Sequence, residues 1–424
     1  MHKGADKSNK NLAYFAGVLA RRWGKKFLQL NEGLDEVFPA TEADRNACMS
    51  LYIHIPFCRT LCPFCCFSRY LFKEDKARRY FETLRKELDF YVQQEIKFSN
   101  FYFGGGTPTV LMDELVRFID FLKDNFDVKL ISIETTPSNI NHQNIDSLKA
   151  AGINRLSIGV QSFDNEVLKS MGRSTVTGEE VKKKLAMAQG HFDTVNADFI
   201  FNFPGQTISK FADDVNTFKS VGIDQATFYP LMPSPLKTTA IERSFKRIDT
   251  SREEDFYDVI LKELYDTGYK ASTAWCFSQD DKMIDEYIVN FDDYIGVGAG
   301  SLSFVKGIFY VNTFSLERYG ALASSGKLPI VLWRNLSERE HLYYYTLTKL
   351  FGMKMNSYDF SQRFGGDPHS KLKRELSLLK LFGLIDDLDD VIVTRKGMYV
   401  VSVMMREFFA AINSLREYCV ANRI

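Results

Sequence analysis

Short apolar runs alternate with amphipathic stretches from Ser50 to Pro230, and this alternation constrains the fold more than any other feature of the chain. Strands are predicted at Leu51–Ile55, Asn100–Phe103, Leu130–Glu134, Arg155–Val160, Val195–Phe201 and Gln225–Pro230. Helices are predicted between them, at Ala77–Tyr91, Leu111–Asn125, Asn144–Ala151, Gly178–His191 and Ser209–Val221. Strand–helix alternation of this kind requires a parallel α/β sheet, either open or closed into a barrel. In a barrel, the loops after the strands converge on one face, where the chemistry is expected.

The pattern changes at about residue 331, where helices begin to dominate. Helices are predicted at Ser337–Phe351, Ser357–Phe364, Ser370–Phe382 and Lys396–Cys419, with a short strand at Val391–Thr394. This part resembles a winged-helix appendage. Three domains are therefore expected: an N-terminal amphipathic segment (1–48), a barrel (49–330) and a C-terminal helical domain (331–424). Lys and Arg together number 54, as do Asp and Glu, so the net charge gives no support for nucleic-acid binding.

Residues 11–31 are predicted to form an amphipathic helix. Its apolar stripe comprises Leu12, Phe15, Leu19, Trp23 and Phe27, and it is flanked by Arg21, Arg22, Lys25 and Lys26. Such a helix packs on the main domain or lies on an anionic membrane. The start of the chain is polar and no run of about 18 apolar residues exists, so a cytoplasmic protein is expected, with peripheral membrane contact through this helix as an option.

Four of the seven cysteines lie between Cys58 and Cys66, which is unlike a disulfide framework. Cys58, Cys62 and Cys65 have the spacing C-x3-C-x2-C. Three thiolates on one short loop can bind three irons of a [4Fe–4S] cluster and leave the fourth iron open for another molecule. Zinc is the alternative, although zinc loops favour paired C-x2-C motifs and this chain has no second pair.

Four motifs in order carry a resemblance to a known family. They are Tyr52-Ile-His-Ile-Pro-Phe-Cys58, Gly104-Gly-Gly-Thr-Pro-Thr109, Asn154-Arg-Leu-Ser-Ile-Gly-Val-Gln-Ser-Phe163, and Asp198 with Pro204-Gly-Gln-Thr207. Together they resemble the oxygen-independent coproporphyrinogen III oxidase (HemN-like) family of radical S-adenosylmethionine (SAM) enzymes, from about residue 50 to 320. The resemblance implies a partial (β/α) TIM-like barrel with a mostly helical, winged-helix-like C-terminal domain. It also implies a [4Fe–4S] cluster, SAM and a low-potential electron donor of the flavodoxin or ferredoxin type.

The resemblance also implies roles for individual residues. The first SAM is expected against Tyr52, Phe64, Gly105, Gly106 and Glu134, and a second SAM against Gly106, Thr107, Gln161, Arg173 and Asp198. From the sequence alone, the two aromatic residues are interpreted as core residues and the glycines as a strand-to-helix turn. Glu134 alone would be a solvated carboxylate, and Asp198 a strand-end carboxylate. No single catalytic residue is predicted.

The chain also departs from the family. The oxidase has a further cysteine two residues beyond the third ligand, where this chain has Phe67, and Cys66 is interpreted as a packing residue. A His-Asn-x-x-Tyr-Trp motif of the heme-chaperone branch is missing before Asp293, where the chain reads Asp285-Glu-Tyr-Ile-Val-Asn290. Three functions follow: a class C radical SAM methyltransferase, a decarboxylating porphyrinogen oxidase and a heme chaperone. The sequence hypothesis favours the methyltransferase, because the further cysteine and the heme-chaperone motif are missing and aromatic residues make up 14% of the chain. Its expected substrate is an aromatic or quinone-type compound, with menaquinone as the specific choice.

Overall fold

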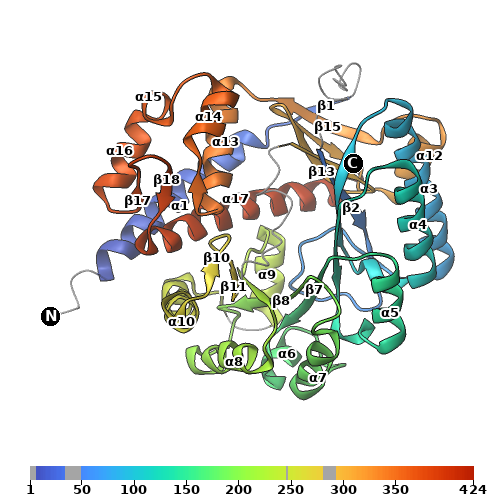
Figure 1. Cartoon of the computed structure of the whole chain (residues 1–424), viewed down its shortest axis with the longest axis horizontal. Helices are drawn as coiled ribbons and strands as arrows, with labels where there is room; N and C mark the ends of the chain where they lie inside the picture. Colours follow the sequence, from blue (N-terminus) through green and yellow to red (C-terminus); the bar gives the residue numbers. More distant parts are fainter. Residues whose placement is uncertain (1–5, 34–48, 245–246, 280–292) are drawn as a thin grey trace.

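The computed structural model describes residues 6–33, 49–244, 247–279 and 293–424. Their main feature is a curved sheet of 13 strands with seven parallel strands in its middle (Figure 1). In spatial order these are β12 (Tyr294–Val297), β2 (Met49–Ile55), β5 (Phe98–Gly105), β6 (Leu130–Thr135), β7 (Arg155–Gln161), β8 (Thr194–Phe201) and β9 (Gln225–Pro230). The predicted parallel α/β fold is confirmed.

Helices cover the outer face of this sheet (Figure 1). They are α3 (Glu74–Gln93), α4 (Met112–Asn125), α5 (His142–Ala150), α7 (Gly178–Ala188), α8 (Ile208–Val221) and α10 (Glu253–Glu263). All seven residues of β2 are buried, because one side of the strand meets helices and the other meets the interior of the partial barrel. Local sequence fixes where the helices begin: Thr177 and Glu180 form a capping box for α7, and Asn141 caps α5.

Antiparallel strands extend the sheet at both edges, and most of them were not predicted, since among these segments only residues 293–304 look strand-like in the sequence. On one side lie β13 (Leu302–Val305), β14 (Ile308–Asn312), β15 (Ile330–Asn335) and β1 (Asn31–Glu32), and on the other β11 (Cys276–Ser278) and β10 (Lys270–Ala271). The short helices α6 (Asn165–Ser170), α9 (Pro235–Ser244) and α12 (Leu316–Ser324) were also missed. Since β15 begins at the proposed boundary of residue 330 and pairs with β14, the main sheet reaches past that boundary. The three-domain division stays a prediction.

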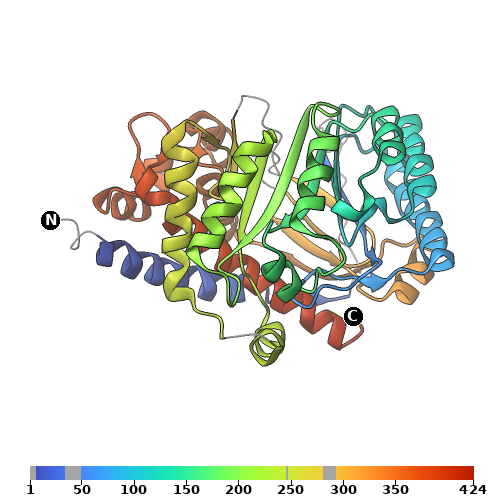
Figure 2. The ribbon, with the colours of Figure 1, turned by 90° about the horizontal axis from the view of Figure 1, so that it is seen from below.

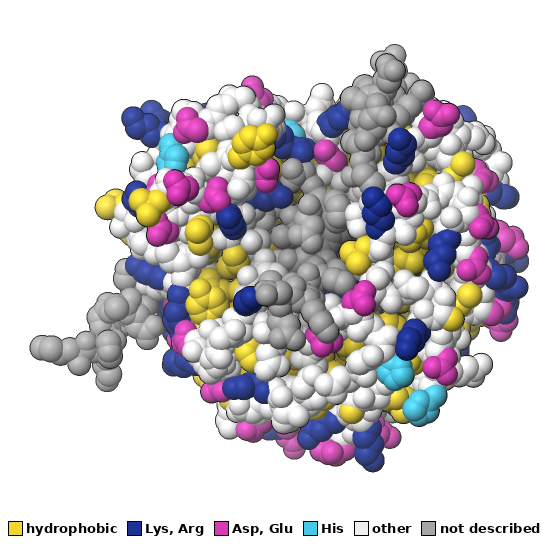
Figure 3. Space-filling model, viewed as in Figure 1, with side chains coloured by type: hydrophobic (Ala, Val, Ile, Leu, Met, Phe, Trp, Pro, Cys, Tyr) yellow, Lys and Arg dark blue, Asp and Glu magenta, His cyan; other side chains and the backbone are white. Residues whose placement is uncertain are grey.

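The C-terminal part combines helices with a three-stranded sheet, β16 (Lys354–Met355), β18 (Val391–Val393) and β17 (Ile385–Asp386). Its helices are α13 (Glu338–Phe351), α14 (Ser357–Phe364), α15 (Pro368–Lys371), α16 (Lys373–Leu381) and α17 (Arg395–Ala421). The helix predicted at 370–382 is therefore two helices, separated at Leu372. On the face shown in Figure 3, acidic and basic side chains are interspersed, in keeping with the net charge of zero.

The N-terminal helix α1 (Asp6–Phe27) lies against α17 (Figures 1 and 2). Its buried face consists mostly of small residues, Ala13, Gly17, Ala20 and Gly24, followed by Phe27. The predicted apolar stripe is therefore only partly the packing face, since Phe15 and Leu19 are 65% and 63% exposed. Small residues bring the two helix backbones close together. Of the larger residues of the stripe, Trp23 and Phe27 pack against Phe408 of α17, whereas Phe15 and Leu19 are left outside. Among the described residues, no helix is long and apolar enough to cross a membrane.

Candidate functional site

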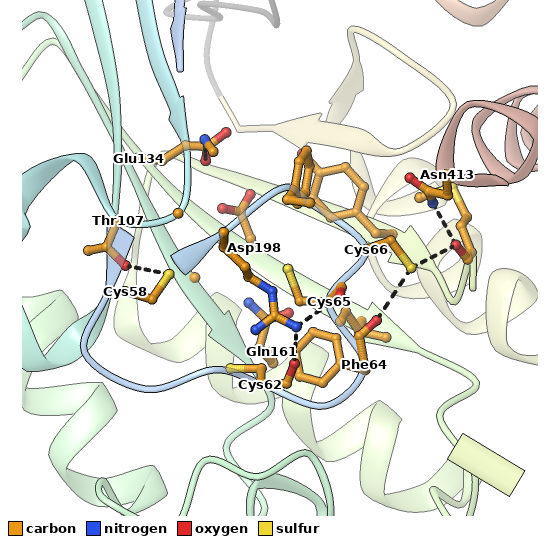
Figure 4. Close-up of a pocket in the computed structure, with 18 of the residues that line it drawn as sticks. Cys58, Cys62, Phe64, Cys65, Cys66, Thr107, Glu134, Gln161, Asp198 and Asn413 are labelled. Carbon is orange, nitrogen blue, oxygen red and sulfur yellow. Dashed lines mark hydrogen bonds between the residues drawn. The ribbon is translucent and has the colours of Figure 1, made fainter. Parts of the chain in front are cut away.

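A cavity with a volume of about 400 Å³ lies where the carboxyl ends of the parallel strands meet the cysteine loop and α17. All twelve residues assigned to the site from sequence line it: Tyr52, Cys58, Cys62, Phe64, Cys65, Gly105, Gly106, Thr107, Glu134, Gln161, Arg173 and Asp198. Figure 4 shows the cysteine loop between Glu134 and Thr107 on one side and Asn413 on the other. The structure thus brings together every predicted residue, whereas their roles as ligands stay predictions.

The side chains of Thr107 and Arg69 hold the cysteine loop in place. Thr107 donates its hydroxyl to the Cys58 sulfur at 3.6 Å, and Arg69 Nη2 donates to the carbonyl oxygens of Cys62 and Cys65 at 2.5 and 2.9 Å. Nε and Nη1 of Arg69 are buried without a hydrogen-bond partner. Arg69 therefore places a positive charge beside the three thiols, and sequence reasoning missed it because it belongs to none of the quoted motifs.

The three thiols fit an iron–sulfur cube better than a single metal ion. Among the described residues, no three His, Cys, Asp or Glu side chains lie close enough together to hold one ion. A cube places its thiolates on three separate irons, so it needs a wider tripod than zinc does. Burial raises the pKa of the Cys58 thiol, and a bound cluster would supply the positive charge that keeps it deprotonated.

Glu134, at the end of β6, accepts hydrogen bonds from the Tyr102 hydroxyl at 3.0 Å and the Gly105 amide at 3.3 Å. Gly105 has φ of +112°, and a Cβ there would lie 2.6 Å from the His54 ring. A Cβ on Gly106 would lie 2.7 Å from the Phe57 amide nitrogen. Close packing against protein thus already requires both glycines, apart from any approach by SAM.

His54 is buried next to the site and uses both ring nitrogens. Nδ1 lies 3.0 Å from the Tyr52 hydroxyl, and Nε2 lies 2.9 Å from the Ser68 carbonyl oxygen. Burial lowers the pKa of His54 to about 4, so the ring is neutral near pH 7. This histidine orients Tyr52 and ties β2 to the segment after the cysteine loop.

A second polar group forms on β7 and β8, with Gln161 at the end of β7. Asp198 accepts from the Ser157 hydroxyl at 2.8 Å and from the Asn196 side-chain amide at 2.7 Å. Gln161 follows a bulge in β7 and has φ of +71°, a strained conformation that is common at functional sites. Arg173 donates to the Gly159 carbonyl, while its buried Nε has no partner and suits an anionic group.

The third wall comes from α17, which the sequence did not link to the site. It contributes Met405, Phe408, Phe409, Ile412, Asn413 and Arg416. Asn413 donates to the Met232 carbonyl at 2.7 Å, and the Cys66 sulfur also contacts that oxygen, at 3.7 Å. Because α17 is about 350 residues from the cysteine loop in sequence and has no motif, no sequence signal could have identified this wall.

Residues 52–218 match the model of the radical SAM superfamily. The chain is 26% identical to the heme chaperone HemW of Bacillus subtilis, over 82% of this chain and 96% of that protein. It is 27% identical to an anaerobilin synthase of Escherichia coli O157:H7, over 75% of this chain and 74% of that protein. It is 26% identical to an oxygen-independent coproporphyrinogen III oxidase of Helicobacter pylori, over 85% of this chain and 86% of that protein.

Among solved structures, coproporphyrinogen III oxidase (HemN) from Escherichia coli aligns with a TM-score of 0.74 and 24% identity. The alignment covers 90% of this chain and 95% of that chain. It confirms the partial TIM-like barrel and the helical C-terminal region.

These comparisons overturn the predicted methyl transfer to menaquinone. The relatives are named heme chaperone, anaerobilin synthase and coproporphyrinogen III oxidase, and none of these names describes a methyltransferase. The cavity gives a physical reason for the error. Four arginines and two carboxylates line its described part, and a neutral quinone has no negative charge to pair with the excess of arginines. The cysteine motif, the fold and these relatives together support the assignment of the chain to the radical SAM superfamily, among proteins similar to coproporphyrinogen III oxidase and HemW.

Proposed function

We propose that this chain is a radical SAM oxidoreductase that acts on a tetrapyrrole bearing carboxylate side chains, with oxidative decarboxylation as its reaction. The observation that carries the proposal is the cavity, which combines a three-cysteine loop, aromatic walls and an excess of positive charge. The names of the relatives point to the same substrate class, since coproporphyrinogen III oxidase and heme chaperone HemW are among them.

The lining of the cavity supports a flat, anionic substrate. Its arginines are Arg59, Arg69, Arg173 and Arg416, and its carboxylates in the described part are Glu134 and Asp198. Its aromatic residues are Tyr52, Phe64, Phe67, Tyr102, Tyr229, Trp275, Tyr294, Phe309, Tyr344, Phe408 and Phe409. Aromatic walls bury a flat ring system, and guanidinium groups pair with carboxylates through two parallel hydrogen bonds.

The cofactors would be held by the residues assigned from sequence. Cys58, Cys62 and Cys65 would bind the [4Fe–4S] cluster, and Glu134 would accept from the SAM ammonium group. When bound, the cluster and SAM supply one-electron chemistry that removes a hydrogen atom from an unactivated carbon. Tyr102 keeps the Glu134 carboxylate in position, and the apolar walls keep water from the reacting carbon.

A second SAM is part of the proposal. Asp198 lies on β8 and Arg173 in the segment after α6, and both belong to a polar group separate from Glu134 on β6. Asp198 would accept from a ribose hydroxyl, and the unpartnered Nε of Arg173 would donate to a carboxylate. Equilibrium binding should therefore give two SAM molecules per chain, and a stoichiometry of one would contradict this part of the proposal.

Heme binding without turnover is the second candidate, because the relative named heme chaperone HemW is matched over 96% of its length. The described residues favour it less. His54 is the one described histidine that lines the cavity, and both of its nitrogens already have partners. The stretch where the chaperone motif would occur, residues 285–290, lies outside the described residues.

Two partners complete the proposal. A low-potential donor of the flavodoxin or ferredoxin type would reduce the cluster, and Leu61, Phe67 and Leu71 are exposed beside the cysteine loop, where such a donor would dock. Reversible contact with an anionic membrane through residues 11–31 is supported by the exposure of Tyr14, Phe15 and Leu19 on α1. Sedimentation with anionic vesicles, before and after Phe15→Ser with Leu19→Ser, tests the membrane contact.

The deciding experiment is an anaerobic reaction of cluster-containing protein with SAM, a chemical reductant and coproporphyrinogen III. Formation of deoxyadenosine together with carbon dioxide is the expected result. Stoichiometric heme binding without any carbon dioxide would support the chaperone instead. Deoxyadenosine at the same rate with and without the porphyrinogen, with no carbon dioxide, would overturn the proposed reaction.

A further inference from the structure

Arg416 is a positively charged group of the cavity that no motif identified. It lies on α17, one turn after Asn413, and lines the cavity with it. Figure 4 shows Asn413 beside Cys66, on the side of the cavity away from Glu134 and Thr107. Arg416 therefore belongs to the wall that faces the strand ends assigned to SAM.

The side chain of Arg416 is held in a fixed position. Its Nη1 donates to Asn413 Oδ1 at 2.8 Å, and Asn413 in turn donates to the Met232 carbonyl at 2.7 Å. The guanidinium carbon lies 4.7 Å from the centre of the Phe67 ring, within the range of a cation–π contact. These contacts occupy one N–H and one face of the guanidinium, so the remaining N–H groups can bind a ligand.

No carboxylate among the described residues lies within ion-pair distance of Arg416. Its neighbour Glu417 accepts instead from the Leu236 amide at 3.2 Å. Arg406, on the same helix, is different, because it pairs with Glu253 and Glu407 at 2.5 and 2.8 Å. One helix thus carries one neutralised arginine in the packed interior and one arginine without a counterion in the cavity.

The positive charge of Arg416 affects the pKa of ionisable groups in the middle of the site. It opposes the rise in pKa that burial imposes on Tyr52, and it adds to the fall in the pKa of His54. A cation that affects two groups on β2 attracts an anionic ligand to the space beside that strand.

We propose that Arg416 binds a carboxylate of the substrate and so orients the substrate ring over the cysteine loop. This inference rests on the proposed function, since it assigns one carboxylate of the tetrapyrrole to one residue. It gives the C-terminal helix a role in binding: α17 supplies the anchor for the substrate, while the strand ends hold SAM. An Arg–carboxylate pair with two parallel hydrogen bonds would fix orientation as well as affinity.

The test compares coproporphyrin III with its tetramethyl ester in anaerobic titrations of the full-length, cluster-containing protein. The variants are Arg416→Met, Arg416→Lys and the control Arg395→Met, which removes a surface arginine of the same helix that pairs with Asp266. Arg416→Met should weaken binding of the acid about ten- to a hundredfold and leave that of the ester unchanged. The affinity of Arg416→Lys for the acid should lie between that of Arg416→Met and that of the unaltered protein, because lysine keeps the charge without the planar guanidinium. Arg395→Met should bind both porphyrins as the unaltered protein does.

SAM affinity and iron content distinguish substrate binding by Arg416 from a role in binding SAM or in holding the cluster. Both quantities should be unchanged in Arg416→Met. Unchanged affinity for the acid, or a fall in SAM affinity in place of it, would overturn the assignment of Arg416. Failure of the unaltered protein to bind either porphyrin would instead overturn the proposed substrate class, and the inference with it. If Arg416→Met does not accumulate as folded protein, the ratio of acid to ester affinity in Arg416→Lys decides the question.

Discussion

The cysteine loop has no spare ligand, and this sets the first expectation for single residues. Each single replacement by Ala, at Cys58, Cys62 or Cys65, should abolish the cluster and all SAM cleavage, because a cluster held by only two thiolates is not retained. Iron content and visible absorbance after anaerobic reconstitution measure this. Cys66 is the matched control, since its sulfur makes only weak contacts at 3.7 Å with the Phe64 and Met232 carbonyls. Retention of the cluster in Cys65→Ala and its loss in Cys66→Ala would reverse the ligand assignment.

Glu134 supports a second expectation. Glu134→Ala should weaken SAM binding by roughly ten- to a hundredfold, since a hydrogen bond to a charged group contributes about 1.5–3 kcal/mol. Tyr102→Phe is the control, because it removes only the 3.0 Å bond that positions the carboxylate. Its effect on SAM affinity, measured by equilibrium binding, should be smaller. Equal losses in the two variants would mean that Tyr102 itself binds SAM.

The residues that sequence could identify are those with local motifs. Cys58 and Asp198 belong to recognisable motifs, Glu134 lies near the end of a predicted strand, and the fold brings all three into one cavity. Arg69 and Arg416 could not be identified, because their importance comes from contacts with residues that only the folded chain places beside them. Gly105 and Gly106, at the end of β5, were predicted from SAM binding alone, which is an incomplete reason. The His54 ring and the Phe57 backbone already exclude a side chain at these positions.

At the level of helices, α1 shows how a hydrophobic pattern can misidentify a packing face. Large apolar residues predicted a stripe, whereas α17 contacts the small-residue face, where Gly17 and Gly24 allow close approach. A Cβ on Gly17 would lie 2.9 Å from Val403 Cγ1, which is closer than side chains tolerate. The helical spacing of residues and their size, rather than their hydrophobicity alone, identify the face of a helix that packs on another helix.

Gly17→Ala tests this packing directly. The added methyl group should lower the free energy of unfolding by about 1–3 kcal/mol, as overpacking does elsewhere. Gly320→Ala is a matched control on α12, where a Cβ would meet no atom within 4 Å. That change should stabilise the protein by about 0.4–1 kcal/mol, since alanine loses less backbone entropy than glycine in a helix. Thermal unfolding curves that shift the same way for both variants would contradict the proposed contact.

The sheet edges show a different limit of sequence patterns. Regular alternation of strands and helices predicted β2 and β5 to β9, because each parallel strand needs a crossover. The antiparallel strands β13 and β14 are joined by a tight turn, and β15 pairs with β14 in antiparallel orientation after α12, so the criterion of parallel strands with crossovers could not find them. Their place beside β12 was set by pairing across the sheet, which a single sequence does not display.

Across the whole molecule, Glu87 links segments that are more than 200 residues apart. From α3 it accepts hydrogen bonds from the Gly298 amide, the Asn312 side chain and the Tyr319 hydroxyl, at 2.8, 2.7 and 2.6 Å. The loop containing Gly298 joins β12 to β13 and lines the cavity through Gly300 and Leu302. One buried carboxyl group thus fixes the seam where the parallel strands meet the antiparallel extension.

This link should depend on pH. Burial raises the pKa of Glu87 from 4.5 to about 7, so the folded state holds a proton that the unfolded state releases above about pH 4.5. Stability contributed by the neutral form is therefore complete below pH 4.5 and is lost as pH rises to 7, by about 3 kcal/mol in all.

Glu87→Gln removes this titration, although its amide group meets hydrogen-bond donors and should destabilise the fold at every pH. The difference in unfolding free energy between the unaltered protein and Glu87→Gln should hence narrow from pH 4.5 to 7, measured by denaturant titration at several pH values. A difference that widens over this range would mean that the three donors hold Glu87 as a carboxylate, with a pKa below its usual value.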